Sequence, residues 1–181
     1  MRINLKNSKT QYGLIARILH WASVAMLLTI IVLASQLTDK APGPEKLELI
    51  SQHASIGILL LMLMTTRLTW RNLNPNPIQS YRIKTWQKLV AISLHRSIYI
   101  IIIAQCGLGI LMLLTSGEAI HLFNVFELAP LLEKASPIHA TVLGFHYLIS
   151  VMIYPLFAVH ITAAIHHQIF GLVEDYSIME K

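Results

Sequence analysis

The sequence contains a single cysteine and few charged residues. Cys106 stands alone among 181 residues, which excludes a disulfide within the chain and an iron–sulfur cluster held by four thiolates. A C-x-x-C-H motif for covalent haem attachment is also absent. Only 13% of the residues are charged and 55% are hydrophobic, whereas soluble domains carry about 25% charged residues. The composition therefore indicates an integral membrane protein, and the length fits one bundle rather than two domains.

Four long apolar runs make up most of the chain. They cover about residues 14–37, 49–70, 89–115 and 143–170, and each is long enough to cross about 30 Å of hydrocarbon as a helix. The first run is too long for the apolar part of a signal peptide and lacks a clear cleavage site, so we expect a retained anchor. The predicted fold is an all-α integral membrane four-helix bundle, in one domain over residues 1–181. Pro155 should bend the last helix. Residues 116–137 are expected to form a longer loop with a short helix on the membrane surface.

Basic residues gather at one end of the predicted bundle. Of the 14 lysines and arginines, three fall on the other end, namely Lys40, Lys46 and Lys134. The positive-inside rule therefore predicts that both termini and the 72–88 loop lie in the cytoplasm. Topology thus accounts for the net charge of +5, and no nucleic-acid partner is expected.

Histidines recur inside the apolar runs, where a buried imidazole is costly and marks a functional candidate. His146 and His160 are fourteen residues apart, so at about 100° and 1.5 Å per residue they share one helix face about 21 Å apart. With the predicted topology, His53 lies at the depth of His146, and His20 lies at the depth of His160. Two imidazoles hold one haem b without covalent attachment. The spacing therefore indicates two haems, one in each half of the membrane.

Depth leaves one assignment open. His95 on the third run has nearly the same depth as His20. His139 lies on nearly the same face as His146, but it is too near the start of its helix to lie deep in the membrane. Depth alone therefore does not choose between His20 and His95 as the partner of His160.

Basic side chains accompany the inner histidines. Arg67 follows His53 by fourteen residues and shares its face, at the end where it would reach the propionates of the inner haem or merely anchor the helix by snorkelling. His167 falls on the face of His160, and His166 points away. His167 would pass protons to a quinone near neutral pH or cap the helix end. The same end also gathers Lys84, Lys88 and Arg96. We therefore expect quinone chemistry at the cytoplasmic end.

The histidine pattern resembles the prokaryotic cytochrome b561 family. The matching features are His20 followed by Trp21, His53 opening the second run, Arg67 ending it, His146 and His160 fourteen residues apart, and the A-x-I-H-H run at 163–167. The resemblance covers about Gly13 to Phe170. It implies four transmembrane helices in a bacterial inner membrane and two haems b. On this resemblance, His20 and His160 ligate one iron, and His53 and His146 ligate the other.

The resemblance also implies electron transfer with ubiquinone. Some family members oxidise superoxide at the outer face, and others are haem-bearing anchor subunits that carry electrons for a partner dehydrogenase or hydrogenase. Candidates for the quinone chemistry are His167, Arg67 and His95. Membrane lipid and ubiquinone are the expected partners, with superoxide, a second copy of the chain or a partner redox protein as further options. A histidine-lined transporter of metal ions or protons is a third hypothesis, which the absorbance of the purified protein would separate from the other two.

Overall fold

Four long helices dominate the computed structural model, which describes residues 4–75, 77, 84–123, 125–133 and 136–179, with side chains as far as His166. The helices are α1 (Leu14–Asp39), α2 (Pro44–Leu73), α3 (Thr85–Thr115) and α4 (Pro137–Met179). All four are long and apolar enough to cross a membrane, α4 over Pro137–His166. The predicted all-α membrane bundle is therefore confirmed. The helices extend beyond the predicted runs, and α4 begins at Pro137 because proline suits the first helical position.

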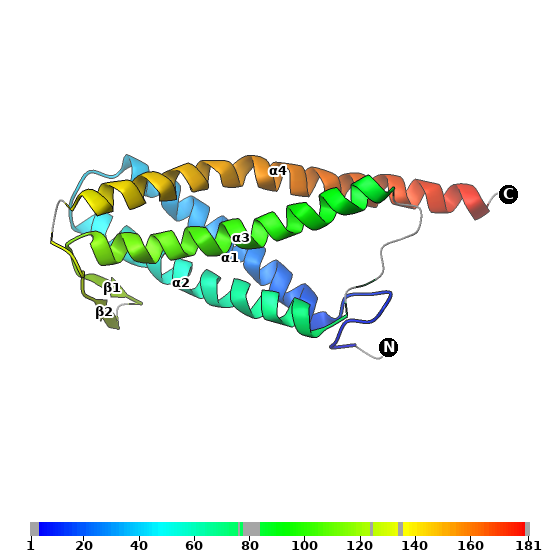
Figure 1. The fold of residues 1–181 in the computed structure, drawn as a ribbon, viewed down its shortest axis with the longest axis horizontal. Coiled ribbons are helices and arrows are strands. Elements are labelled where there is room, and N and C mark those ends of the chain that lie inside the picture. Colours follow the sequence, from blue (N-terminus) through cyan, green and yellow to red (C-terminus); the bar gives the residue numbers. More distant parts are fainter. Residues whose placement is uncertain (1–3, 76, 78–83, 124, 134–135, 180–181) are drawn as a thin grey trace.

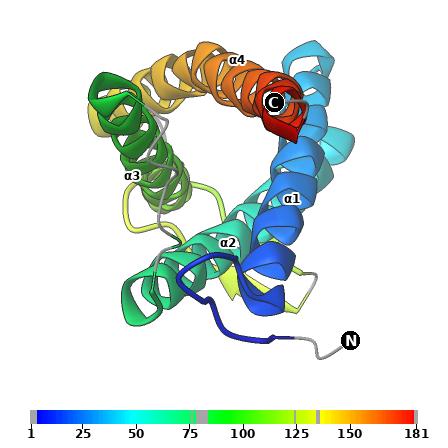
Figure 2. The ribbon, with the colours of Figure 1, turned by 90° about the vertical axis from the view of Figure 1, so that its right-hand side faces the viewer.

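The helices run side by side along the long axis, in chain order around the bundle (Figures 1 and 2). α1 packs on α2, α2 on α3, and α3 on α4. We call the end that holds the α1–α2 and α3–α4 connections the loop end. The opposite end, where α1 begins and α4 finishes, is called the terminal end (Figure 1). Both termini thus lie at one end (Figure 1), and which compartment that end faces stays a prediction. α4 continues as one helix through Pro155.

A two-stranded hairpin lies in the α3–α4 connection, where we expected a loop with a surface helix. β1 (Ile120–Leu122) pairs antiparallel with β2 (Phe126–Leu128). The turn between them begins at Phe123, whose φ of 54° is positive. The surface-helix prediction is therefore wrong for the described part of this connection. The I-H-L and F-E-L triplets alternate apolar and polar residues, which is the period of a strand rather than of a helix.

The main core lies in the middle of the bundle. Its buried residues come from α1, α2 and α3: Leu27, Leu60, Met64, Ile98, Tyr99, Ile102 and Cys106. Met64 is 0% exposed, and Leu156 and Phe157 of α4 pack against the cluster. This apolar layer separates the histidines near the loop end from those near the terminal end.

The N-terminal segment turns back against the start of α1. The backbone N–H of Leu14 donates to the carbonyl of Asn4 (2.9 Å), and that of Gly13 donates to Oδ1 of Asn7 (3.0 Å). A Cβ at residue 13 would overlap the carbonyl of Leu5, so this close approach of two backbones requires glycine. The segment therefore lies against the start of α1 at the terminal end.

Candidate functional site

Two histidines face each other near the loop end. His53 lies on α2 and His146 on α4, each nine residues after the first residue of its helix. Their ring centroids are 6.4 Å apart, and the ring planes form an angle of 73°. An imidazole–metal bond of about 2 Å on each side, plus about half a ring on each side, spans roughly the same interval. The pair therefore has the spacing that one iron between two imidazoles requires.

The immediate surroundings of this pair are polar only in part. Nε2 of Gln105 donates to the backbone carbonyl of His146 at 3.0 Å. A Cβ at Gly109 would lie 3.4 Å from Cε1 of His146, so the missing side chain leaves space for the ring. The ring of His53 lies beside the backbone of Ile30 and that of His146 beside the backbone of Gln105, but neither Nδ1 atom makes a well-aligned hydrogen bond among the described residues. Gln105, Gly109 and the backbone beside each ring therefore form the immediate surroundings of the pair.

Three histidines converge near the terminal end. His20 of α1, His95 of α3 and His160 of α4 line a cavity of about 300 Å³. The rings of His95 and His160 are in edge contact, with centroids 5.3 Å apart. The other residues that line the cavity are Asn7, Tyr12, Ala16, Arg17, Trp21, Arg67, Trp70, Arg71, Tyr99 and Ala164. The structure thus brings His160 together with both of its candidate partners, His20 and His95.

The hydrogen bonds of the two rival ligands differ. Nδ1 of His95 donates to the carbonyl of Ala91 at 2.7 Å, which leaves Nε2 of that ring without a proton. Nδ1 of His20 lies 2.7 Å from NH2 of Arg67, and it accepts there because a guanidinium only donates. The ring contact to His160 belongs to His95. The assignment of His20 as the iron ligand therefore stays a prediction.

Two guanidinium groups flank one aromatic ring in the same cavity. Cζ of Arg67 lies 5.4 Å from the ring centroid of Tyr99, and that of Arg71 lies 5.8 Å from it. No carboxylate lines the cavity in the described part of the chain. Sequence reasoning singled out Arg67 but missed Arg71 and Tyr99. A periodicity signal was available, because Arg71 is one turn after Arg67 and Tyr99 is one turn after His95.

Along nearly its whole length, the chain matches one protein family. The sequence model of prokaryotic cytochrome b561 matches residues 11–179. The chain belongs to the prokaryotic cytochrome b561 family. It is also similar to "Cytochrome b561 homolog 2" of Escherichia coli (strain K12), with 28% identity over 144 aligned positions; the match covers 74% of this chain and 71% of that protein. The resemblance inferred from the histidine pattern is confirmed. Membership makes this chain a membrane electron-transfer protein and implies haem b.

Several basic residues predicted for the terminal end of this cytochrome b561 lie away from the cavity. Lys84, Arg96 and His166 are exposed. The side chain of His167 lies outside the described residues. At the loop end, Nδ1 of His139 lies 3.3 Å from Oγ1 of Thr115. The charge of the cavity therefore comes from Arg17, Arg67 and Arg71 rather than from the lysines.

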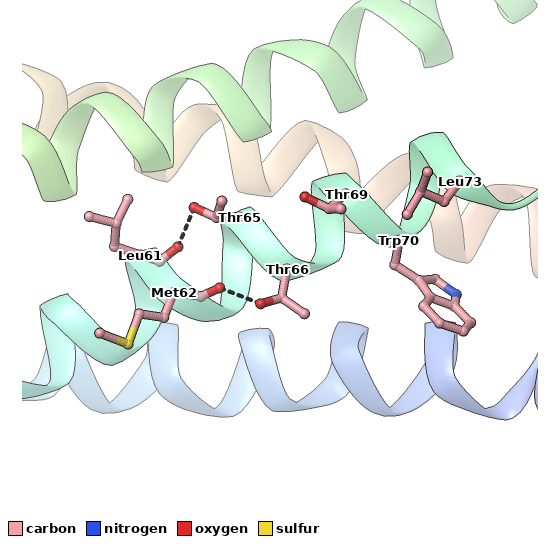
Figure 3. Close-up of a pocket in the computed structure, with 7 residues that line it drawn as sticks. All are labelled: Leu61, Met62, Thr65, Thr66, Thr69, Trp70 and Leu73. Atoms are coloured by element: carbon pink, nitrogen blue, oxygen red, sulfur yellow. Dashed lines mark hydrogen bonds between the residues drawn. The ribbon is translucent and has the colours of Figure 1, made fainter.

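A shallow groove of about 500 Å³ follows the outward face of α2 toward the terminal end (Figure 3). It is lined by Leu61, Met62, Thr65, Thr66, Thr69, Trp70 and Leu73. The hydroxyls of Thr65 and Thr66 donate to carbonyls of their own helix at 2.8 Å, so they present mainly methyl groups. Trp70 lines both this groove and the histidine cavity. Its buried Nε1 has no partner among the described residues. In this cytochrome b561, Trp70 therefore lies between the groove on α2 and the histidine cavity.

Proposed function

We propose that this chain is a di-haem b oxidoreductase that exchanges single electrons with ubiquinone in a bacterial inner membrane. The observation that carries the proposal is the separation of two histidine groups by the apolar core of the bundle. Haem b held by two imidazoles supplies one-electron oxidation and reduction at an iron that has no open coordination position. In this proposal, His53 and His146 hold one haem, and His20 and His160 hold the other.

Arg67 has a specific role in this proposal. A histidine that ligates iron through Nε2 keeps its proton on Nδ1 and donates from it. Nδ1 of His20 instead accepts from Arg67, so iron ligation through Nε2 and this hydrogen bond exclude each other. If His20 held haem iron through Nε2, the guanidinium of Arg67 would be free of this hydrogen bond. It and Arg71 then provide the positive charge that the two haem propionates require.

The quinone site is proposed at the terminal end of the bundle. The groove on α2 is where a membrane quinone would approach this site, because Trp70 lines both the groove and the cavity. The unpaired indole N–H is a donor for a quinone carbonyl. The imidazole of His95, which His20 leaves free, takes up a proton at its unprotonated Nε2 and passes it to the quinone, and Arg67 stabilises negative charge. His167, one residue beyond the described side chains of α4, is a further proton donor.

The loop end is proposed to face the periplasm, with the terminal end in the cytoplasm. Six carboxylates belong to the loop end: Asp39, Glu45, Glu48, Glu118, Glu127 and Glu133. They outnumber its three lysines, of which Lys40 is paired with Glu45 at 2.6 Å. An acidic surface repels superoxide and attracts a basic protein. This favours a second candidate function, a haem-bearing anchor subunit that receives electrons from a docked dehydrogenase or hydrogenase.

Haem content tests the di-haem assignment. Wild-type protein should yield about two haems b per chain in a pyridine haemochromogen assay. The variants His146→Ala and His160→Ala should each lose one haem and keep the spectrum of the other. His20→Ala should also lose one, whereas His95→Ala should keep both. One haem per wild-type chain would refute the two-site model. Retention in His20→Ala together with loss in His95→Ala would reverse the ligand assignment.

Stopped-flow kinetics separate the two donor classes. The oxidised protein is mixed with superoxide, and the reduced protein with a short-chain ubiquinone, at several salt concentrations. Fast reduction by superoxide followed by quinone reduction would establish a superoxide oxidase, with a rate that rises with salt because screening weakens repulsion by the carboxylates. Slow reduction by superoxide, together with co-purification of a basic redox protein, would establish the anchor role.

A further inference from the structure

The N-terminal segment, residues 4–13, runs alongside the start of α1 and the end of α2 (Figures 1 and 2). Two of its side chains, those of Asn7 and Tyr12, line the histidine cavity of the terminal end. Tyr12 also lies within electrostatic range of Arg67. The segment therefore contributes two polar side chains to a site whose other lining residues come from the four helices.

Hydrogen bonds to the start of α1 hold the segment in this position. The helix has no side-chain cap at Gly13, so its first N–H groups need acceptors from elsewhere. The carbonyl of Asn4 accepts from the N–H of Leu14 at 2.9 Å. Oδ1 of the buried Asn7 accepts from the N–H of Gly13 at 3.0 Å. Tyr12, which directly precedes Gly13, is thereby fixed beside the cavity.

Hydrogen-bond donors predominate among the polar groups around this cavity. Three of these groups are guanidinium groups, which only donate, namely those of Arg17, Arg67 and Arg71. Oδ1 of Asn7 is taken by the backbone of Gly13, so its NH2 group is what this side chain can offer to a ligand. The buried Nε1–H of Trp70 has no partner among the described residues, and no carboxylate of that part of the chain lines the cavity. The site therefore suits an anion with several acceptor oxygens.

We propose that Tyr12 donates its phenolic O–H to a propionate of the haem at His160, and that the N-terminal segment holds it in place to do so. This inference rests on the proposed haem at the terminal end. A propionate is favoured over a quinone carbonyl, because a hydrogen bond to a charged acceptor is about twice as strong as one to a neutral acceptor. Tyr12 is also 55% exposed, at the edge of the cavity, where a carboxylate keeps its contact with water. Arg67 and Arg71 balance the charge of the propionates, and Tyr12 fixes the position of one of them.

The rate at which haem passes to excess apomyoglobin measures how firmly the protein holds it. Two backgrounds separate the sites, since His146→Ala should keep only the terminal-end haem and His160→Ala only the loop-end haem. Tyr12→Phe should make release about tenfold faster in the first background, because a hydrogen bond to a charged group is lost, and should leave the second unchanged. The matched control is Tyr154→Phe, which should change neither rate. Tyr154 is similarly exposed, at 56%, and is not among the described residues that line the cavity.

Resonance Raman spectroscopy of the His146→Ala chain distinguishes a propionate contact from a general loosening of the cavity. The bending mode of a haem propionate moves to lower frequency when the propionate loses a hydrogen bond. Tyr12→Phe should therefore shift this band downward, and Tyr154→Phe should leave it in place.

Loosening the N-terminal segment should act in the same direction. Asn7→Ala removes the oxygen that accepts from the N–H of Gly13, so release of the terminal-end haem should become several-fold faster. The matched control is Gln11→Ala, which alters an exposed residue next to Tyr12 and should leave the rate unchanged. An unchanged rate in Asn7→Ala would refute the contribution of the segment.

The outcomes separate this inference from the di-haem assignment. If His146→Ala and His160→Ala do not each keep one haem, the assignment fails and the role of Tyr12 fails with it. If each keeps one haem, but Tyr12→Phe leaves the terminal-end haem unchanged in release and in Raman band, the role of Tyr12 alone is refuted. Equally faster release in both backgrounds would refute it too, by showing a loss of stability throughout the bundle. Faster release without a Raman shift would also count against it, because the phenol would then contact something other than a propionate.

Discussion

A leucine at Gly109 is expected to remove the loop-end haem, because this glycine lies directly against His146. A Cβ there would be 3.4 Å from Cε1 of the imidazole, which is already a tight contact. The three further carbons of leucine extend into the volume that the ring occupies. Gly107 offers a matched control two residues away on α3, since nothing lies within 4 Å of a Cβ at that position.

The expected size of the effect follows from overpacking. Forcing additional carbons against a packed group costs about 1–3 kcal/mol, and a displaced imidazole loses its alignment with the iron. At about 1.4 kcal/mol for each factor of ten, haem affinity at that site should fall by roughly fivefold to a hundredfold. Gly109→Leu and Gly107→Leu gain the same helix propensity, about 0.8–1 kcal/mol. Their difference therefore isolates the contact with His146.

The assay is haem content together with thermal unfolding in detergent. Gly109→Leu should fall to about one haem per chain, with the other haem spectrally unchanged, and Gly107→Leu should keep about two. Gly109→Ala should keep both, because the ring needs to shift by only a few tenths of an ångström. Size-exclusion chromatography and circular dichroism verify that each variant is folded. Equal haem content in the two leucine variants would refute the placement of a haem at His146.

Three further predictions concern the terminal end. Arg67→Gln should lower the reduction potential of the terminal-end haem by tens of millivolts, because a nearby positive charge favours the reduced state. Redox titration measures this potential, and substitution of the exposed Arg96 by glutamine should leave it unchanged. Gly13→Ala should destabilise the N-terminal segment by about 1–3 kcal/mol through its overlap with the backbone, which limited proteolysis would detect as faster cleavage, whereas Gly43→Ala should not, since nothing lies within 4 Å there. Trp70→Phe should raise the KM for quinone without changing haem content; an unchanged KM would remove the indole from the quinone site.

Much of the fold could be predicted because the signals are local. An apolar run long enough to cross a membrane predicts a helix whatever its neighbours are. The four helices α1 to α4 could therefore be predicted from the hydrophobicity of each segment. The hairpin could not be predicted in this way. Each of its strands has three residues, too few for a periodicity to stand out, and it is held by Ser51 and Ser55, about seventy residues earlier in the chain.

In the candidate site, too, some residues could be predicted from the sequence and others depend on the packing of the helices. A histidine inside an apolar run is conspicuous by itself, so all five imidazoles of the two groups could be found from the sequence. Their neighbours depend on packing between helices. Gln105 and Gly109 gain a role only because α3 packs on α4 at His146. Similarly, the choice between His20 and His95 depends on hydrogen bonds across the bundle that no spacing encodes.

The two ends of the bundle also differ in charge, which bears on the direction of electron transfer. The terminal-end cavity contains Arg67 and Arg71 beside Tyr99, with no carboxylate among its described lining residues. The described contacts of His53 and His146 involve an amide, a glycine, backbone groups and each other, and no cation. Since a cation stabilises the reduced form of a neighbouring redox group, the same ligand chemistry should have the higher potential at the terminal end. The negative charge of two haem propionates there would offset part of this difference in reduction potential. The same propionates are the groups that Arg67 and Arg71 would bind. The charge asymmetry therefore favours electron transfer from the loop end toward the quinone at the terminal end.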